Sequence, residues 1–257
     1  MSEEGKNDLE ELGLSEFFDY PKPVEFVTQL VQAVTLKSKK EDDVILDFFA
    51  GSGTTAQAVM VQNVADEGNR KWICVQLPES TDEDSEAYKA GYKKISDISR
   101  ERIRRAGDKI GKGDVGFKSY RLSQSNHRQW QPITEEGDTA LLLKQSKMLL
   151  DHPLVDGYDE MSVVCEILVK EGYDLNSTIF KVDSGDTDIP WPHYIVGDKA
   201  PKTEAARSMI ITFTEKINAK DLENAKIKLA DLFVCFDSAL DDTGKVNAGR
   251  EGNIKTI

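Results

Sequence analysis

Two glycines stand close together in the stretch 47–55, DFFAGSGTT, immediately after a short apolar run. Gly51 and Gly53 allow backbone angles that other residues rarely adopt, and they let a ligand approach the main chain closely. The residues that follow are typical of a helix, whose first N–H groups would favour a bound carboxylate or phosphate. The hydroxyls of Thr54 and Thr55 would add hydrogen-bond donors there. The pattern predicts a ligand site at a strand-to-helix turn.

Two familiar phosphate-binding motifs do not fit this turn. A P-loop ends in Gly-Lys followed by Ser or Thr, whereas Gly53 is followed directly by Thr54. The dinucleotide fingerprint needs a third glycine three residues after the second, and Ala56 stands there. Strand-to-helix turns also use glycine for packing alone. From these residues, a ligand site and a purely structural turn are both open.

The elements around the turn follow one another as strand, helix and strand. Residues 44–49 and 71–77 are predicted as buried strands, with a helix at 52–65 between them. Upstream, an amphipathic pattern that starts at Pro23 predicts a helix ending near 37–40. In an open α/β sheet the ligand binds beyond the carboxyl ends of the strands, which is where the turn would lie.

The rest of the chain is predicted to hold an acidic start, a basic helix and a second region. We expect residues 1–16 to be a loose lead-in, residues 86–106 to form one helix capped by Ser85, and 115–122 to form a strand. The second region, 136–257, is expected to be a smaller α/β or α+β domain. Its predicted elements are helices around 140–150, 160–172 and 220–230, a hairpin from 177–182 to 192–197, and strands at 209–213 and 231–236.

Charge is spread unevenly along the chain, which has a formal net charge of -13. Between Lys89 and Arg128, twelve basic residues stand against four acidic ones, a local excess of +8. Such a band can be a solvated or salt-bridged helix face, or it can contact nucleic-acid phosphates. Arg100 and Arg104 are the candidates for phosphate contact.

Cysteine, histidine and hydropathy patterns argue against several other kinds of site. Cys74, Cys165 and Cys235 lie far apart in apolar runs, which favours free thiols over disulfides or a metal site. The three histidines lack metal-ligand spacing. No apolar run approaches the ~18 residues of a membrane helix, and the acidic start is unlike a signal peptide. We therefore expect no metal and no membrane partner, and a cytoplasmic location.

The glycine turn is preceded by Lys22 and Pro23 in YPKP, and these motifs together resemble the amino-methyltransferases that modify adenine N6 or cytosine N4 in DNA. The stretches WICVQLPE and ISDISRERIRRA resemble the modification subunits of type III restriction-modification systems, and FVCFDSALDDTGKVNA resembles their C-terminal end. The resemblance implies S-adenosylmethionine as cofactor. It also implies an α/β fold with a partial Rossmann-like methyltransferase sheet.

The resemblance implies a role for each matching position. The Lys22–Pro23 segment would lie against the cofactor, Phe49 would pack beside it, and Asp47 with the turn would hold its methionine end. Gln76 stands where most of the broader family has an acid for the ribose hydroxyls, and an amide can pair with hydroxyls too. The implied cofactor-binding residues are Lys22, Pro23, Asp47, Phe49, Ala50, Gly51, Ser52, Gly53, Thr54, Thr55 and Gln76.

One motif of the family is missing. These enzymes act through an Asp/Asn-Pro-Pro-Tyr/Phe loop upstream of the Lys-Pro segment, and this sequence contains no adjacent prolines. A base must be flipped into such a pocket before its amino group can be methylated. We therefore expect no catalytic residue here. Residues 17–125 would be the cofactor-binding region in a C-terminal portion of a modification subunit, from a cloned fragment or a truncated or split gene.

Two classes of function follow from these observations. In the first, the chain is part of a type III DNA adenine-N6 methyltransferase and is inactive alone; DNA, a second modification subunit and a restriction subunit are partners of the complete enzyme. In the second, it is a non-catalytic assembly module that docks another modification or restriction subunit, and the glycine turn is only structural. A methyltransferase acting on a small molecule or protein is a third alternative, against which the position of the Lys-Pro segment speaks.

Overall fold

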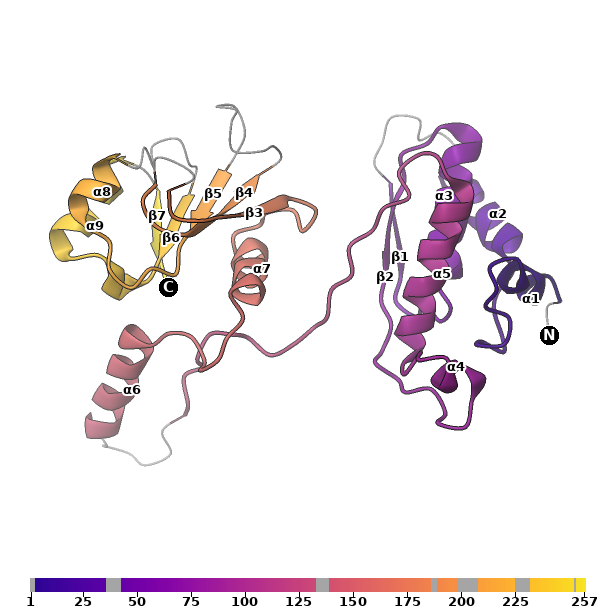
Figure 1. The fold of residues 1–257 in the computed structure, drawn as a ribbon, viewed down its shortest axis with the longest axis horizontal. Helices are drawn as coiled ribbons and strands as arrows, with labels where there is room; N and C mark the ends of the chain where they lie inside the picture. Colours follow the sequence, from indigo (N-terminus) through magenta and orange to yellow (C-terminus); the bar gives the residue numbers. More distant parts are fainter. Residues whose placement is uncertain are drawn as a thin grey trace. The chain divides into compact units, whose positions relative to one another are not determined.

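The computed structural model describes residues 3–35, 43–132, 139–185, 189–197, 208–224, 232–251 and 253–257 (Figure 1). The chain divides into two compact units, Met1–Tyr120 and Arg121–Ile257. Each unit combines helices with a sheet, so the fold is mixed α/β. Within the described ranges, no helix is long and apolar enough to cross a membrane.

The first unit is a parallel strand pair with helices packed on one side (Figure 1). Its parallel register places Asp47 opposite Cys74, at the ends of the two strands, which confirms the predicted strand–helix–strand order. The predicted extension of the second helix to 37–40 lies outside the described residues. The elements are α1 (Glu3–Glu10), α2 (Val24–Val34), β1 (Val44–Asp47), α3 (Thr54–Asp66), β2 (Lys71–Cys74), α4 (Glu86–Lys89) and α5 (Ile95–Ile110).

The beginning of the chain is not the loose lead-in that was expected. α1 and the turn after it bury Leu9, Leu12 and Leu14 in the same core as residues of α3 and α5. Gly5 brings α1 so close to the next segment that a Cβ there would lie 2.3 Å from the Pro21 carbonyl oxygen. Acidic residues dominate the composition of this stretch, but the three leucines determine how it packs.

The basic region also differs from the expectation. Residues 86–106 form two helices rather than one, because Gly91 between α4 and α5 has a φ of 98°, which is not a helical conformation. Ser85 caps α4 as predicted, accepting a backbone hydrogen bond at 3.1 Å. Residues 115–122 do not form the expected strand. Apolar side chains of that stretch pack against the helical core instead of pairing with a neighbouring strand.

The second unit is built on a five-stranded mixed sheet in the order β3-β4-β5-β6-β7. The β3–β4 and β4–β5 pairs are antiparallel, and the β5–β6 and β6–β7 pairs are parallel. These elements confirm the predicted hairpin, strands and first two helices; part of the third predicted helix, 225–230, lies outside the described residues. The elements are α6 (Thr139–Asp151), α7 (Glu160–Lys170), β3 (Thr178–Val182), β4 (His193–Gly197), β5 (Ser208–Ile211), α8 (Ala219–Asn224), β6 (Leu232–Cys235), η2 (Asp237–Ala239), α9 (Asp242–Glu251) and β7 (Ile254–Thr256).

This second unit is longer than the first, not smaller as expected. It also begins earlier than the expected residue 136, because residues 125–127 are anchored on it. The Glu166 carboxylate on α7 accepts hydrogen bonds from the Ser125 hydroxyl at 2.5 Å and from the Asn126 backbone N–H at 2.8 Å. His127 also forms an isolated bridge with Leu154.

The two sheets differ in how their faces are covered. In the second unit, Met209 and Ile211 of β5 pack on the α7 side, while Ile210 packs with residues of α8 and η2 on the other. In the first unit, β1 and β2 alternate exposed and half-buried side chains, so the prediction that both are buried strands is wrong. Trp72 and Cys74 pack on the helical core. The opposite face carries apolar side chains that are 48% to 57% exposed, namely Val44, Leu46, Ile73 and Val75.

Candidate functional site

The glycine turn joins β1 to α3, and both of its glycines have backbone angles that favour glycine. Gly51 has a φ of 53°, and Gly53, the N-cap of α3, has a φ of 86°. A Cβ on Gly53 would lie 3.2 Å from both the Ser99 carbonyl oxygen and Ile103 Cγ1. A Cβ on Gly51 would come no closer than 3.5 Å, to Phe18. Gly53 therefore permits close packing on α5, whereas Gly51 faces roomier surroundings.

The chain after β2 fixes the start of the turn. The Ala50 N–H donates to the Val75 carbonyl oxygen at 3.0 Å. The Gly51 N–H donates at 2.8 Å to Oε1 of Gln76, the residue expected to contact a ribose. Because its oxygen holds the turn, Gln76 has its amide nitrogen as the group that could donate to a ligand hydroxyl.

Asp47, at the end of β1, binds both sides of the turn. Its Oδ1 accepts a hydrogen bond from the Phe49 N–H at 3.0 Å, and its Oδ2 accepts one from Thr55 Oγ1 at 2.5 Å. The Thr55 hydroxyl, predicted as a donor to a ligand, thus donates to the protein. The carboxylate also lies at the N-terminus of α3, where the helix dipole favours negative charge.

Ser52 and Thr54 are buried in the turn, with 3% and 5% of their surface exposed. Nη1 of Arg102 donates to Ser52 Oγ at 2.6 Å and to Thr54 Oγ1 at 2.7 Å. Thr54 Oγ1 in turn donates a long hydrogen bond, 3.4 Å, to the Lys22 carbonyl oxygen. Three segments that are far apart in sequence therefore meet at Thr54.

The Lys22–Pro23 segment reaches the turn through its main chain. Pro23 is the N-cap of α2, and the next N–H, that of Val24, donates to Asp8 Oδ2 on α1 at 2.8 Å. α1 thus caps the helix that follows the Lys-Pro segment. The Lys22 side chain itself is exposed.

Phe49 presents an aromatic surface beside the turn. Its residue surface is 75% exposed, and that of the neighbouring Phe48 is 62% exposed. The two ring centroids lie 5.1 Å apart. An exposed aromatic ring next to a glycine turn can pack against a flat ligand. The structure thus brings the predicted positions together at one end of the β1–β2 pair, with Pro23 following the Lys22 carbonyl that accepts from Thr54.

Sequence reasoning missed the residues of α5 and α1 that support the turn. Ser99 Oγ donates to the Gly51 carbonyl oxygen, and Arg102 binds the two hydroxyls beyond it. A helical stripe could have revealed them, since Ile98 and Ile103 are buried and flank the two polar residues. Asp8 gave no such signal, because its partner, the Val24 N–H, lies 16 residues further along the chain.

Arg100 and Arg104, the candidates for phosphate contact, are exposed and form ion pairs along α5. Arg100 pairs with Asp97, and Arg104 pairs with Glu101 at 2.8 Å and with Asp108 at 2.6 Å. Hydrogen bonds from Arg104 lower the pKa of Glu101 to about 2, against the opposing effect of burial. Acidic partners therefore compensate much of the positive charge on this face.

The cysteine thiols and the His193 ring show no arrangement suited to catalysis or metal binding among the described residues. Burial raises the pKa of the Cys74 and Cys235 thiols to about 12, so both are protonated at neutral pH. The His193 ring lies 2.9 Å from the Trp191 carbonyl oxygen, and burial lowers its pKa. In the part of the chain that the structure describes, no three His, Cys, Asp or Glu side chains could hold a metal ion.

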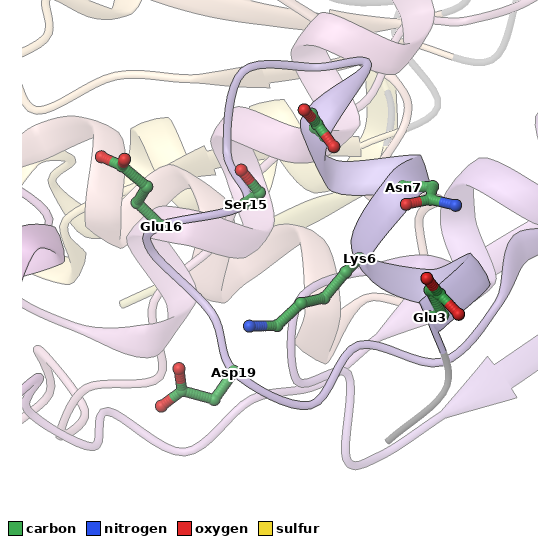
Figure 2. A pocket seen from close by; sticks show the side chains of 7 residues that line it. Glu3, Lys6, Asn7, Ser15, Glu16 and Asp19 are labelled. Carbon is green, nitrogen blue, oxygen red and sulfur yellow. The ribbon is translucent and has the colours of Figure 1, made fainter.

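A depression in the first unit lies on α1 and the loop after it (Figure 2). Four acidic side chains line it around a single lysine, which makes it unsuited to a phosphate or carboxylate ligand. None of the predicted cofactor-binding residues belongs to it. Its lining is Glu3, Lys6, Asn7, Glu10, Ser15, Glu16 and Asp19.

Comparison with known families gives a match over the N-terminal third of the chain. Residues 1–87 match the family model described as DNA methylase. The matched range includes the Lys-Pro segment, the glycine turn and β2.

Curated relatives match over somewhat less than half of the chain. The Type III restriction-modification enzyme StyLTI Mod subunit of Salmonella typhimurium is 41% identical over 128 residues, 48% of this chain and 19% of that protein. The EcoPI Mod subunit of Escherichia phage P1 is 42% identical over 116 residues, 43% of this chain and 17% of that protein. The Type II methyltransferase M.KpnI of Klebsiella pneumoniae is 37% identical over 107 residues, 42% of this chain and 25% of that protein. These matches confirm the resemblance to type III modification subunits, and the matched part covers a quarter or less of each relative.

Proposed function

We propose that this chain is the cofactor-binding and C-terminal portion of a site-specific DNA adenine-N6 methyltransferase of a type III restriction-modification system. One observation carries the proposal: the glycine turn is preformed, because hydrogen bonds with the segment after β2, with the Lys22 carbonyl before α2 and with α5 fix its conformation before any ligand arrives. Preorganisation of this kind lowers the cost of binding. The similarity to modification subunits supports the same assignment.

S-adenosylmethionine would bind at the carboxyl ends of β1 and β2, in a Rossmann-like arrangement. The N–H groups at the start of α3 would receive its methionine carboxylate, and Phe49 would pack beside it. The Lys22–Pro23 segment would lie against it, and the Gln76 amide nitrogen would reach its ribose hydroxyls. The residues fit this ligand because Gly51 has open surroundings and Phe49 is exposed. When bound, the cofactor supplies an electrophilic methyl group.

The catalytic loop and the DNA-reading part of such an enzyme would come from a further polypeptide segment. The sequence has no Pro-Pro motif, and the β1–β2 pair has one apolar face half exposed, as expected of a sheet that more protein completes. The chain would then not methylate DNA by itself. DNA, a second modification subunit and a restriction subunit would be partners of the complete assembly.

A second candidate function is an assembly module that docks another subunit through the second unit. α6 favours it, since this helix buries none of its residues, and Leu143 and Leu150 are 67% and 62% exposed. On this view the glycine turn serves packing only.

Calorimetric titration of the chain with S-adenosylmethionine distinguishes the two functions. We expect saturable binding that Gly51→Leu abolishes, because the side chain would need a strained φ and would fill the space beside the turn. Gly91→Leu is the matched control: Gly91 also has a positive φ but nothing within 4 Å and no part in the turn. Absence of binding by a folded wild-type chain would refute the cofactor role and leave the assembly module.

A further inference from the structure

Arg102 is unlike the other arginines of α5. Its side chain is fully buried, with 0% of the residue exposed, whereas the side chains of Arg100 and Arg104 are 53% and 56% exposed. Burying a guanidinium is costly unless it is paired and hydrogen-bonded. A role in the protein interior must account for this residue, not contact with a nucleic acid.

The contacts of Arg102 are all directed at the turn and the helix that follows it. Nη1 bridges Ser52 Oγ and Thr54 Oγ1, and Nε donates to Gln57 Oε1 on α3 at 2.8 Å. Ser99, one helical turn earlier, donates to the Gly51 carbonyl oxygen. Two residues on one face of α5 therefore hold the turn, one through a main-chain carbonyl and the other through two side-chain hydroxyls.

The environment of Arg102 satisfies only part of its guanidinium. Its Nη2 is buried without a hydrogen-bond partner among the described residues. Burial lowers its pKa to about 10, an effect that the negative charge of Asp8 opposes, so the group is charged at neutral pH. Well-packed apolar residues often replace buried ion pairs without loss of stability. The specific geometry at Ser52 and Thr54 is what an apolar side chain could not reproduce.

We infer that Arg102 is the positioning residue of the cofactor turn, a role that rests on the proposed function. By donating to both buried hydroxyls, Nη1 fixes the two residues that alternate with the glycines, and with them the direction of the main-chain N–H groups at the start of α3. Through Thr54 it also ties the Lys22 carbonyl to the turn. Arg102 itself does not touch the cofactor.

The test compares Arg102→Met, Arg102→Lys and the exposed control Arg104→Met in the full chain. We expect Arg102→Met to weaken S-adenosylmethionine binding about tenfold or more, as when a partner that orients a ligand-binding group is lost. Arg102→Lys keeps the charge but not the bridging geometry, so it should be similarly impaired. Arg104→Met should bind normally. Normal binding by Arg102→Met would overturn the inference.

Amide hydrogen exchange supplies a readout that needs no cofactor. In Arg102→Met the amides of residues 51–55 should exchange about tenfold faster, while those in the second half of α3 stay protected, because the turn opens locally. A merely structural role would instead weaken protection across the whole unit. This arm decides the inference even if the wild-type chain binds no cofactor, a result that would refute the proposed function separately.

Thr54→Val keeps the inference testable if Arg102→Met fails to fold. It removes one acceptor of Nη1 with little change of shape and should speed exchange at the same amides. Combining the two substitutions should give less than the sum of their effects, because each removes the same hydrogen bond. Additive effects would contradict the proposed coupling.

Discussion

The two sheets of this protein are built to different degrees of completeness. The five-stranded sheet of the second unit has apolar clusters on both faces, and Phe233 and Val234 on its β6 strand are at most 1% exposed on opposite sides. The β1–β2 pair has helices on one face, and on the other Leu46 and Ile73 are more than half exposed. A two-stranded sheet alone is marginal, so the first unit relies on its helical core.

The first unit therefore combines a well-ordered glycine turn with an incompletely covered sheet. Its polar site is held by hydrogen bonds with α5 and with the segments before α2 and after β2, although the sheet that carries it has an open face. A ligand turn can therefore be preformed by helices packed on one side. The other side is left for whatever completes the sheet.

The largest test of this comparison removes a core side chain from the covered sheet. Phe233→Ala should destabilise the second unit by about 3–5 kcal/mol, because Phe233 is 1% exposed and its loss leaves a cavity. Leu46→Ala on the open face of β1 should cost the first unit less than about 1 kcal/mol. Urea titration followed by hydrogen-exchange mass spectrometry reads the two units separately. Equal losses at both sites would mean that the open face is covered in solution.

A second test asks whether α1 supports the first unit. Gly5→Ala should destabilise that unit by about 1–3 kcal/mol, because the new Cβ would collide with the Pro21 carbonyl and overpack the contact. Gly249→Ala in α9 is the matched control, since nothing lies within 4 Å of a Cβ there and alanine favours a helix. The same urea titration measures both. Unchanged stability in Gly5→Ala would restore the expectation of a loose N-terminal segment.

Local patterns made much of the fold and the position of the site predictable. The strand, turn and helix around Gly51 are contiguous, and apolar periodicity marks the strands and helices of the second unit. The resemblance added Lys22 and Pro23, and the structure brings the Lys22 carbonyl to the turn through Thr54.

The remaining features could not be predicted from the sequence, because they depend on packing between segments that are far apart in the chain. The charge of its neighbours places Arg102 in the basic band, although it occupies a position on the apolar stripe of α5. Acidic composition hid the leucines that dock α1, and Gly91 breaks a helix that periodicity alone would continue. The Gln76 side-chain oxygen accepts a hydrogen bond from the Gly51 N–H, a contact that the sequence alone does not indicate.

The smallest expected effect is on the pH dependence of stability, which should differ between the two units because each contains a different carboxylate of lowered pKa. Burial would raise the pKa of Glu166, but hydrogen bonds from Lys170, Ser125 and Asn126 outweigh it and lower the pKa from 4.5 to about 2. A carboxylate with a depressed folded pKa stabilises the protein above its unfolded pKa, and this contribution is lost as the pH falls. The second unit should therefore lose stability between pH 4.5 and about 2.

Glu166→Gln should flatten that part of the stability profile of the second unit, because the amide does not titrate. Glu101→Gln is the counterpart in the first unit, where hydrogen bonds from Arg104 lower the carboxyl pKa to about 2 despite burial. Acid titration at fixed urea, followed by exchange in each unit, should show each substitution acting on its own unit alone. A profile of the second unit that stays equally steep in Glu166→Gln would show that other carboxylates govern its acid sensitivity and that the 125–127 anchor contributes little.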